Sequence, residues 1–229
     1  MQLFYEPNIE NKLSLSDEEA RHCFKVLRKN EGDEIVIVDG KGTFFTCLIL
    51  DSNPKKNKLQ IISTQKERES KNKIHLIVAP TKNLDRTEWL VEKSVEIGVD
   101  EITFILTTNS ERRVLKLERI LKKAVSAMKQ SVKSKLPQIN ELILFEKLVL
   151  VENNNLKYIA HLDNEAIRFN AELTNNINNN VNLFIGPEGG FTKEEISLAL
   201  SKDIKPVYFG GSRLRTETAC VYALSILNQ

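Results

Sequence analysis

The stretch LFIGPEGGFTKEE, residues 183–195, decides the fold class. Val181–Ile185 is a short apolar run with the length and composition of a buried strand. A glycine-rich turn follows at residues 186–190, and Thr192 and Glu195 then have the spacing of a capping box that starts a helix. A strand that passes through a short loop into a helix is the unit from which α/β folds are built.

The same alternation extends in both directions from this stretch. We predict further strands at Ile74–Ala79, Glu101–Leu106, Lys157–His161 and Pro206–Phe209, and helices at 85–98, Leu117–Val132, Thr192–Leu200 and near the C-terminus. In the helix at 85–98 the amphipathic pattern places Trp89, Leu90, Val95 and Ile97 inward, and Gly98 ends it. The sequence therefore predicts an α/β layer with a mostly parallel sheet.

The first seventy residues follow a different pattern. Three β-rich runs, Glu34–Val38, Thr43–Leu50 and Lys58–Thr64, are separated by turns, and Ser16 is a candidate N-cap for a preceding helix. We expect a small β-barrel module with one helix, followed by the wholly polar linker at residues 66–73. The predicted domains are residues 1–70 and 71–229.

The composition is that of a soluble globular protein. The chain has 229 residues, of which 41% are hydrophobic and 28% charged, and it contains no apolar run long enough to span a membrane. The N-terminal residues lack the pattern of a secretory signal, and the three cysteines are widely spaced, as expected of free thiols. We therefore expect a cytoplasmic protein without a membrane partner.

The glycine turn at 186–190 is a candidate binding loop. In an open α/β sheet, ligands bind beyond the carboxyl ends of the strands. The turn lacks the lysine of a P-loop and does not match GxGxxG, so it suits a nucleoside-like ligand without a polyphosphate. The alternative is a plain helix-entry loop without a ligand.

A second glycine turn opens the stretch FGGSRLRTETACVYALSILNQ, residues 209–229. In an extended segment Arg213 and Arg215 point the same way and Leu214 points opposite, which predicts a partly buried segment rather than a solvated rim. Thr216 or Thr218 can cap the last helix. The rest of that helix is apolar on every face, so we expect it to be buried all round, in a core or against another subunit.

These motifs together resemble one family. IGPEGGFTKEE and GGSRLRTETA, with APTKNLDRTEWLVEKSVEIGV, SERR, RHCFKVLR and GDEIVIVDGKG upstream, resemble the bacterial 16S rRNA uridine-N3 methyltransferases of the SPOUT superfamily over almost the whole chain. The resemblance implies an N-terminal PUA-like β-barrel, a C-terminal α/β domain with a trefoil knot, and a homodimer through that domain. It also implies S-adenosylmethionine as cofactor, S-adenosylhomocysteine as product, and 16S rRNA within the 30S subunit as substrate.

The resemblance assigns residues to the cofactor and to the chemistry. The expected cofactor-binding residues are Leu162, Gly186, Glu188, Gly189, Gly190, Phe209, Gly210, Arg213, Leu214, Arg215, Thr216, Glu217, Thr218 and Ala219. Arg215 is the candidate for stabilising negative charge on the uracil oxygens, and Glu217 for a base or an orienting group; its alternative reading is a first-turn acid that complements the helix dipole. Lys129 departs from the family pattern, since many relatives have a glutamate there.

Basic residues are the candidates for RNA contact. Arg21, Lys25, Arg28 and Lys29 have helical spacings, while Arg112 and Arg113 follow a predicted strand end. The lysines of 122–135 are either a solvated helix face or a further RNA contact. The three histidines are not spaced as metal ligands, so no metal site is expected.

Two other functions fit parts of the sequence. A non-catalytic RNA-binding or ribosome-assembly factor could keep the PUA-like module without the chemistry. A different nucleotide-binding α/β enzyme could use the glycine turns, but the absence of a P-loop and of GxGxxG counts against it.

Overall fold

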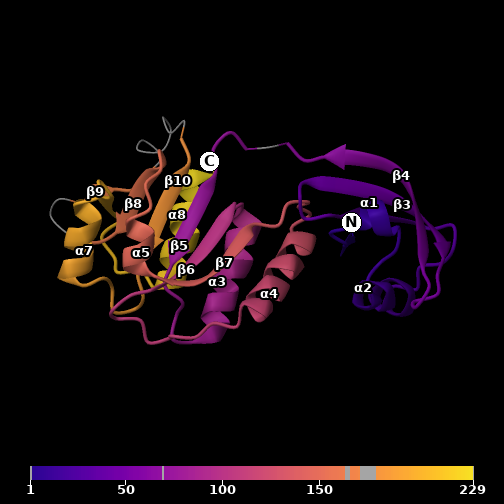
Figure 1. Ribbon diagram of the computed structural model, residues 1–229, viewed down its shortest axis with the longest axis horizontal. Helices are drawn as coiled ribbons and strands as arrows, with labels where there is room; N and C mark the ends of the chain where they lie inside the picture. Colours follow the sequence, from indigo (N-terminus) through magenta and orange to yellow (C-terminus); the bar gives the residue numbers. More distant parts are fainter. Residues whose placement is uncertain (1, 69, 163–165, 171–178, 229) are drawn as a thin grey trace. The chain divides into compact units, whose positions relative to one another are not determined.

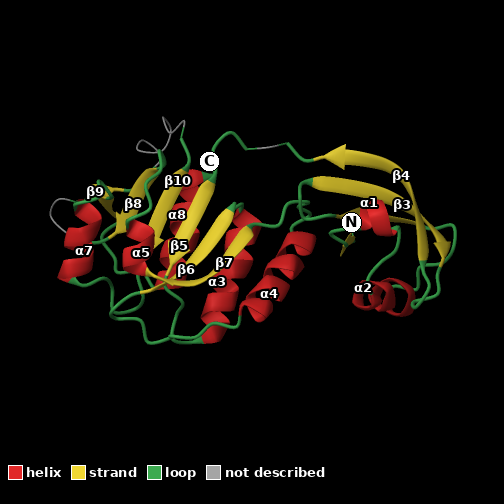
Figure 2. Cartoon of the chain, viewed as in Figure 1, coloured by secondary structure: helices red, strands yellow, loops and turns green. Residues whose placement is uncertain are grey.

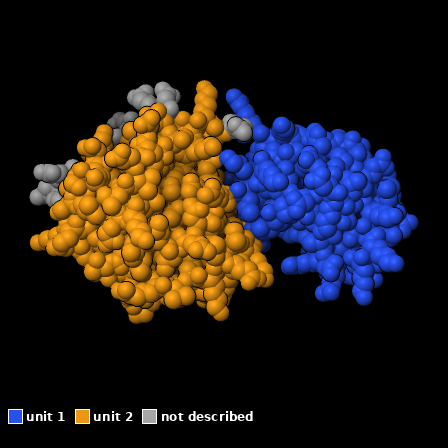
Figure 3. Space-filling view, in the orientation of Figure 1, with its two compact units in different colours: residues 1–69, 125–136 blue, residues 70–124, 137–229 orange. Residues whose placement is uncertain are grey.

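The computed structural model describes residues 2–68, 70–162, 166–170 and 179–228. The chain divides into two compact units (Figure 3). Unit 1 contains residues 1–69 and 125–136, and unit 2 contains residues 70–124 and 137–229. The sequence gave no sign that the segment 125–136 belongs with the N-terminal residues. A role for residues 1–70 in RNA recognition stays a prediction.

Unit 2 is built on a parallel sheet. Its strands are β5 (Ile74–Val78), β6 (Glu101–Leu106), β7 (Gln138–Leu144), β8 (Leu156–Ala160), β9 (Ile167–Arg168), β10 (Val181–Ile185) and β11 (Lys205–Tyr208). Their order is β7-β6-β5-β10-β8-β11-β9, and every pairing among the described residues is parallel. The predicted α/β class with a parallel sheet is thereby confirmed, with β7 and β9 as strands that the sequence did not indicate.

Helices cover both faces of this sheet (Figures 1 and 2). On one face α3 (Leu84–Ile97) contacts α8 (Thr216–Leu227), and on the other α5 (Phe145–Val149) contacts α7 (Lys193–Leu200). Phe145, Phe184 and Ile196 belong to the core under α5 and α7. Thr192 caps α7 through the predicted capping box, and Gly98 ends α3 as expected.

Two details of the helices differ from prediction. Trp89 was expected to point inward, but it is 43% exposed, because α3 turns Leu90, Val91 and Val95 toward the sheet instead. The last helix is not buried all round in this chain: Thr218, Tyr222 and Ser225 form an exposed stripe. Cys220 lies on its buried side, where burial raises the pKa of the thiol well above its usual value.

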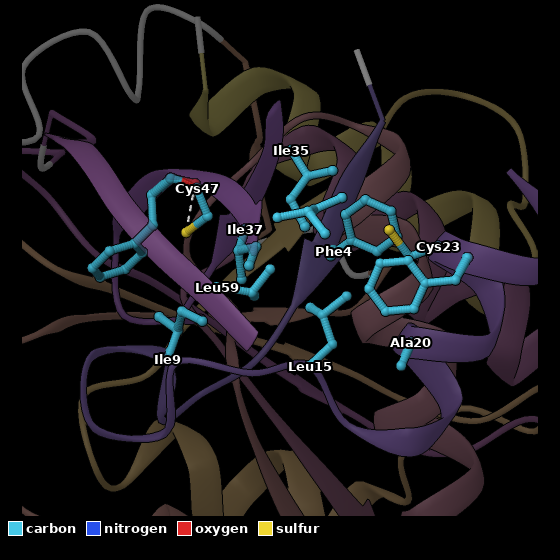
Figure 4. Close-up of a cluster of buried hydrophobic side chains, with 12 residues drawn as sticks. Phe4, Ile9, Leu15, Ala20, Cys23, Ile35, Ile37, Cys47 and Leu59 are labelled. Carbon is cyan, nitrogen blue, oxygen red and sulfur yellow. Dashed lines mark hydrogen bonds between the residues drawn. The ribbon is translucent and has the colours of Figure 1, made fainter. Parts of the chain in front are cut away.

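Unit 1 contains a four-stranded sheet with short helices. Its elements are β1 (Leu3–Tyr5), α1 (Ile9–Lys12), α2 (Asp17–Arg21), the π-helix η1 (His22–Val26), β2 (Glu34–Val38), β3 (Thr43–Asp51) and β4 (Lys58–Lys66), and residues of α4 (Leu117–Gln130) from 125 onward join them. The strand order is β1-β2-β3-β4, with β1 parallel to β2 and the other pairs antiparallel. A single apolar core that includes Phe4, Cys23 and Cys47 fills the unit (Figure 4). Burial raises the pKa of each of these two thiols to about 11.

The departure from the family pattern at Lys129 has a structural explanation. The Lys129 ammonium donates to Glu19 Oε1, and both residues belong to unit 1. Glu19 is 8% exposed, and its other carboxylate oxygen has no partner in the part of the chain that is described. Lys129 therefore neutralises a carboxylate that folding removes from water.

Replacing Lys129 by alanine is expected to destabilise unit 1 by about 2–3 kcal/mol, because it leaves the Glu19 carboxylate buried and unpaired. Equilibrium unfolding in urea measures the loss. The double variant Glu19→Gln, Lys129→Met is the control, and it should recover most of the lost stability. A double variant whose loss equals the sum of the two single losses would show that the pair is not coupled.

His75 makes the stability of unit 2 depend on pH. Its Nε2 lies 2.7 Å from Thr103 Oγ1 and 3.6 Å from Glu101 Oε1. Burial lowers the pKa of His75, and the nearby Glu101 carboxylate offsets this only in part. The folded state therefore disfavours the proton that the unfolded state binds below pH of about 6.5.

Stability is thus expected to fall as the pH drops below about 6.5, because only the unfolded chain takes up this proton readily. His75→Gln keeps a hydrogen-bonding side chain but does not titrate, so its melting temperature should fall less steeply from pH 7.5 to 5. Parallel curves for the two proteins would assign the pH dependence to other groups.

Candidate active site at the ends of the parallel strands

A cavity of about 490 Å³ lies at the carboxyl ends of β8, β10 and β11. Three chain segments form its wall: the residues after β8, the glycine turn after β10, and the loop between β11 and α8. The lining residues are Ala160, His161, Leu162, Ile185, Gly186, Pro187, Glu188, Gly189, Gly190, Phe191, Val207, Tyr208, Phe209, Gly210, Ser212, Arg213, Leu214, Thr216 and Ala219. The cavity is therefore where the strand-end rule for α/β sheets predicts a ligand.

Hydrogen bonds join the two glycine loops. Thr216 Oγ1 donates to Gly186 O at 3.0 Å, and an Arg213 guanidinium nitrogen donates to Glu188 O at 2.9 Å. Neither Thr216 nor Thr218 caps α8: the N-cap residue is Arg215, without a side-chain cap, because the Thr216 hydroxyl is used across the cavity. The expected partial burial of Leu214 between exposed arginines is confirmed.

Most of the residues assigned to the cofactor line this cavity. Those in its wall are Leu162, Gly186, Glu188, Gly189, Gly190, Phe209, Gly210, Arg213, Leu214, Thr216 and Ala219. Arg215, Glu217 and Thr218 do not line it. Arg215 and Thr218 are exposed, and Arg215 makes no hydrogen bond or ion pair with any described residue.

Glu217 lies in the first turn of α8, as predicted, but its partner is not one of the neighbouring arginines. Its Oε1 is 3.7 Å from Nε of Arg86 on α3, and its Oε2 has no partner among the described residues. Glu217 is only 7% exposed. The sequence analysis missed Arg86, although this residue is part of the motif DRTEW.

The loops after β5 and β6 hold the glycine turn from outside. Arg112 donates to Thr81 O at 3.1 Å and to Lys82 O at 2.6 Å, and the Lys82 amide donates to Glu188 Oε1 at 3.1 Å. The Arg112 guanidinium, predicted to contact RNA, is thus engaged within the protein. Arg113 is exposed.

The basic residues of unit 1 do not share a helical face. Arg21 ends α2 and Lys25 lies in the π-helix η1, but the helix stops at Val26. Arg28 adopts a left-handed backbone with φ 56°, so Arg28 and Lys29 follow a different direction from the two residues before them. Arg21, Lys25 and Arg28 are all exposed, whereas Lys29 is half-buried.

Several lysines of 122–135 have acidic partners. Lys122 pairs with Glu118 at 2.9 Å and Lys123 with Glu92 at 3.1 Å, in addition to Lys129 with Glu19. These contacts favour the reading of a salt-bridged helix face over that of an RNA contact.

The chemistry of the cavity wall restricts the ligand. Its described lining contains no lysine and a single arginine, and much of the wall is glycine backbone and apolar side chain. No group of three or more metal-ligating side chains occurs in the described parts of the chain. Such a wall suits a flat, uncharged ring system with hydrogen-bonding edges better than a polyphosphate.

The family model described as an RNA methyltransferase domain matches residues 68–228, which include the whole of this site. The chain belongs to this family. A second model, an RNA methyltransferase PUA domain, matches residues 15–62. Helices of the described chain are all too short or too polar to cross a membrane.

Individual relatives agree with this assignment. The ribosomal RNA small subunit methyltransferase E of Buchnera aphidicola is 31% identical over 221 residues, covering 93% of this chain and 86% of the relative. The crystal structure of a probable rRNA-methyltransferase from Porphyromonas gingivalis is 38% identical, with a TM-score of 0.91, 98% of this chain covered and 95% of the other. The ribosomal RNA small subunit methyltransferase E of Neisseria gonorrhoeae, a structure bound to S-adenosyl methionine, is 28% identical with a TM-score of 0.85 over 98% and 95% of the two chains.

Proposed function

We propose that this protein transfers a methyl group from S-adenosylmethionine to N3 of a uridine in the 16S rRNA of the small ribosomal subunit. The observation that carries the proposal is the cavity at the ends of β8, β10 and β11, formed by the two glycine loops whose motifs resemble the uridine-N3 methyltransferases. Membership of the RNA methyltransferase family and the likeness to a relative bound to S-adenosyl methionine support it.

The residues of the cavity fit this cofactor. An adenosine presents a flat ring and hydroxyl groups, and the wall offers backbone of Gly186, Gly189 and Gly210 with the apolar surfaces of Leu162 and Phe209. The absence of a lysine from the described lining agrees with a cofactor without phosphates. When bound, the cofactor supplies an electrophilic methyl group on a sulfonium.

Arg215 is proposed to act on the substrate rather than on the cofactor. The uracil N3 loses its imide proton during attack, and negative charge then spreads onto the flanking carbonyl oxygens. The Arg215 guanidinium is exposed beside the cavity without an internal partner, so its donors are available to those oxygens. Positioning of the two reactants supplies the rest of the acceleration.

Glu217 is proposed to orient rather than to take the proton. Its carboxylate is buried, lies next to Arg86 and is outside the cavity lining. A buried carboxylate in the first turn of α8 stabilises the helix start and holds Arg86 in place. The same position argues against direct transfer of the N3 proton to Glu217, since the cavity lies elsewhere.

The remaining features of the proposal come from the family resemblance. Unit 1 is proposed to be a PUA-like β-barrel that contacts the RNA through Arg21, Lys25, Arg28 and Lys29, with Arg113 contributing from unit 2. Unit 2 is proposed to form the trefoil knot and a homodimer. The exposed stripe Thr218, Tyr222 and Ser225 on α8 is available for a partner subunit. The 30S subunit is the proposed substrate in the cytoplasm.

Purified 30S subunits and cofactor with a labelled methyl group test the function directly. Transfer of label to a uridine in 16S rRNA, with the base mapped by mass spectrometry, is the expected result. Calorimetry with S-adenosylmethionine separates the alternatives. A folded protein that binds RNA but no cofactor at millimolar concentration is instead a non-catalytic RNA-binding or assembly factor.

A further inference from the structure

The loop after β6 contacts the glycine turn directly, although it does not line the cavity. Asn109 Nδ2 lies 3.2 Å from both Gly189 O and Gly190 O, so its amide donates to two successive carbonyls of the turn. The residues are 80 and 81 positions apart in the chain. No role has so far been assigned to Asn109.

The loop that carries Asn109 is itself firmly held. Its Thr108 donates to Glu195 Oε1 through the backbone amide at 2.7 Å and the hydroxyl at 3.0 Å. Glu195 is 4% exposed, and its other oxygen accepts from the Thr192 amide at 2.8 Å, at the start of α7. Asn109 therefore reaches the turn from a loop that is fixed to the helix following that turn.

The close approach depends on glycine at position 189. A Cβ added to Gly189 would lie 3.0 Å from Asn109 Cβ, which is closer than side chains tolerate. Gly189 does not need a positive φ. The requirement for glycine at this position is thus set by Asn109 and not by the backbone conformation.

Fixing the carbonyls also fixes the neighbouring amides. A trans peptide carries its N–H opposite to its C=O, so the direction of Gly190 O determines that of the Phe191 amide. The preceding peptide is held in the same manner, since the Gly190 amide donates to Pro187 O at 2.8 Å. Phe191 and both glycines line the cavity.

We propose that Asn109 is a positioning residue that holds the Gly189–Gly190 turn in the conformation that accepts the cofactor. The inference rests on the proposed binding of S-adenosylmethionine in this cavity. Without the amide, the two peptide planes are free to rotate, and cofactor binding must then restore their order at a cost in affinity.

Asn109→Asp is the sharpest test, because it keeps the shape of the side chain and places carboxylate oxygens against two carbonyl oxygens. We expect the calorimetric Kd for S-adenosylmethionine to rise about 10-fold or more. The KM for 30S subunits at saturating cofactor should stay unchanged. Asn109→Ala gives the same test, with a smaller rise, in case the aspartate variant does not fold.

Asn155→Asp is the matched control. Its amide also donates to a side-chain oxygen, that of Asn182 at 2.9 Å, but it lies at the opposite end of β8 from the cavity. Equal losses of affinity in the two aspartate variants, or an unchanged Kd in the Asn109 variants, would overturn the inference. If the unchanged protein binds no cofactor, the proposed function itself fails, which is a different result.

A double-mutant cycle tests the steric part. Gly189→Ala should weaken cofactor binding about 10-fold in the unchanged background and much less in Asn109→Gly, where the opposing Cβ is gone. Strictly additive effects would show that Asn109 and Gly189 act independently and would also count against the inference.

Discussion

Arg215→Ala is expected to lower kcat for methyl transfer about 100-fold or more while the Kd for S-adenosylmethionine changes little. Donors that meet charge formed only in the transition state contribute on this scale when they are removed. Arg215 is exposed and lies outside the cavity lining, so its loss should not disturb the cofactor wall. Single-turnover rates at saturating cofactor and 30S subunits give kcat, and calorimetry gives the Kd.

Arg213→Ala is the matched control for this prediction. The Arg213 guanidinium lines the cavity and donates to Glu188 O at 2.9 Å, so its removal loosens the contact between the two loops. The expected pattern is the reverse, with weaker cofactor binding and a smaller change in kcat. Arg215→Lys should retain part of the rate, since it keeps the charge but not the paired donors.

Unchanged turnover of Arg215→Ala at saturating cofactor would remove this residue from the mechanism. The proposed function would survive that result, because the cofactor site does not include the Arg215 side chain in its wall. The charge on the uracil oxygens would then have to be met by another group.

The strands that the sequence predicted well are those buried in the middle of the sheet. Val181–Ile185 and Glu101–Leu106 were predicted to the residue, because a strand covered on both faces is a continuous apolar run with sharp ends. β7 was missed because it lies at an edge of the sheet, where its residues are only half-buried or exposed and the apolar run is broken.

The site was predictable where glycine and a strand end coincide. The turns at 186–190 and 209–211 could be recognised because loops of that composition at strand ends bind ligands. Arg86 and Asn109 could not, since each reaches its partner across a long stretch of sequence: Asn109 lies 80 residues from Gly189. Contacts of this kind follow from the order of the strands, which local periodicity does not determine.

The expectation that α8 is buried on all sides failed for a related reason. Its apolar residues outnumber the polar ones, but Thr218, Tyr222 and Ser225 recur at intervals that bring them onto one stripe. A threonine, a tyrosine and a serine tolerate water, so an average over the helix hides a face that can meet solvent or a partner.

Gly210→Ala is expected to weaken S-adenosylmethionine binding about 10- to 100-fold, which corresponds to ~1.4–2.8 kcal/mol. Gly210 has φ +122°, a backbone conformation that residues with a Cβ rarely adopt, and nothing lies within 4 Å of the added methyl group. The cost is therefore one of backbone strain, typically about 1–3 kcal/mol, which the loop relieves by leaving this conformation. Because Gly210 lines the cavity, relief of the strain changes the wall that receives the cofactor.

Gly42→Ala separates strain from function. Gly42 has φ +103° and is likewise free of neighbours within 4 Å, but it lies between β2 and β3 in unit 1. Both variants should lose stability by similar amounts in thermal unfolding, since the backbone penalty is the same in kind. Only Gly210→Ala should lose affinity in calorimetry. If both bind the cofactor as tightly as the unchanged protein, the loop between β11 and α8 does not take part in binding, because strain placed within a binding wall must be shared with the ligand.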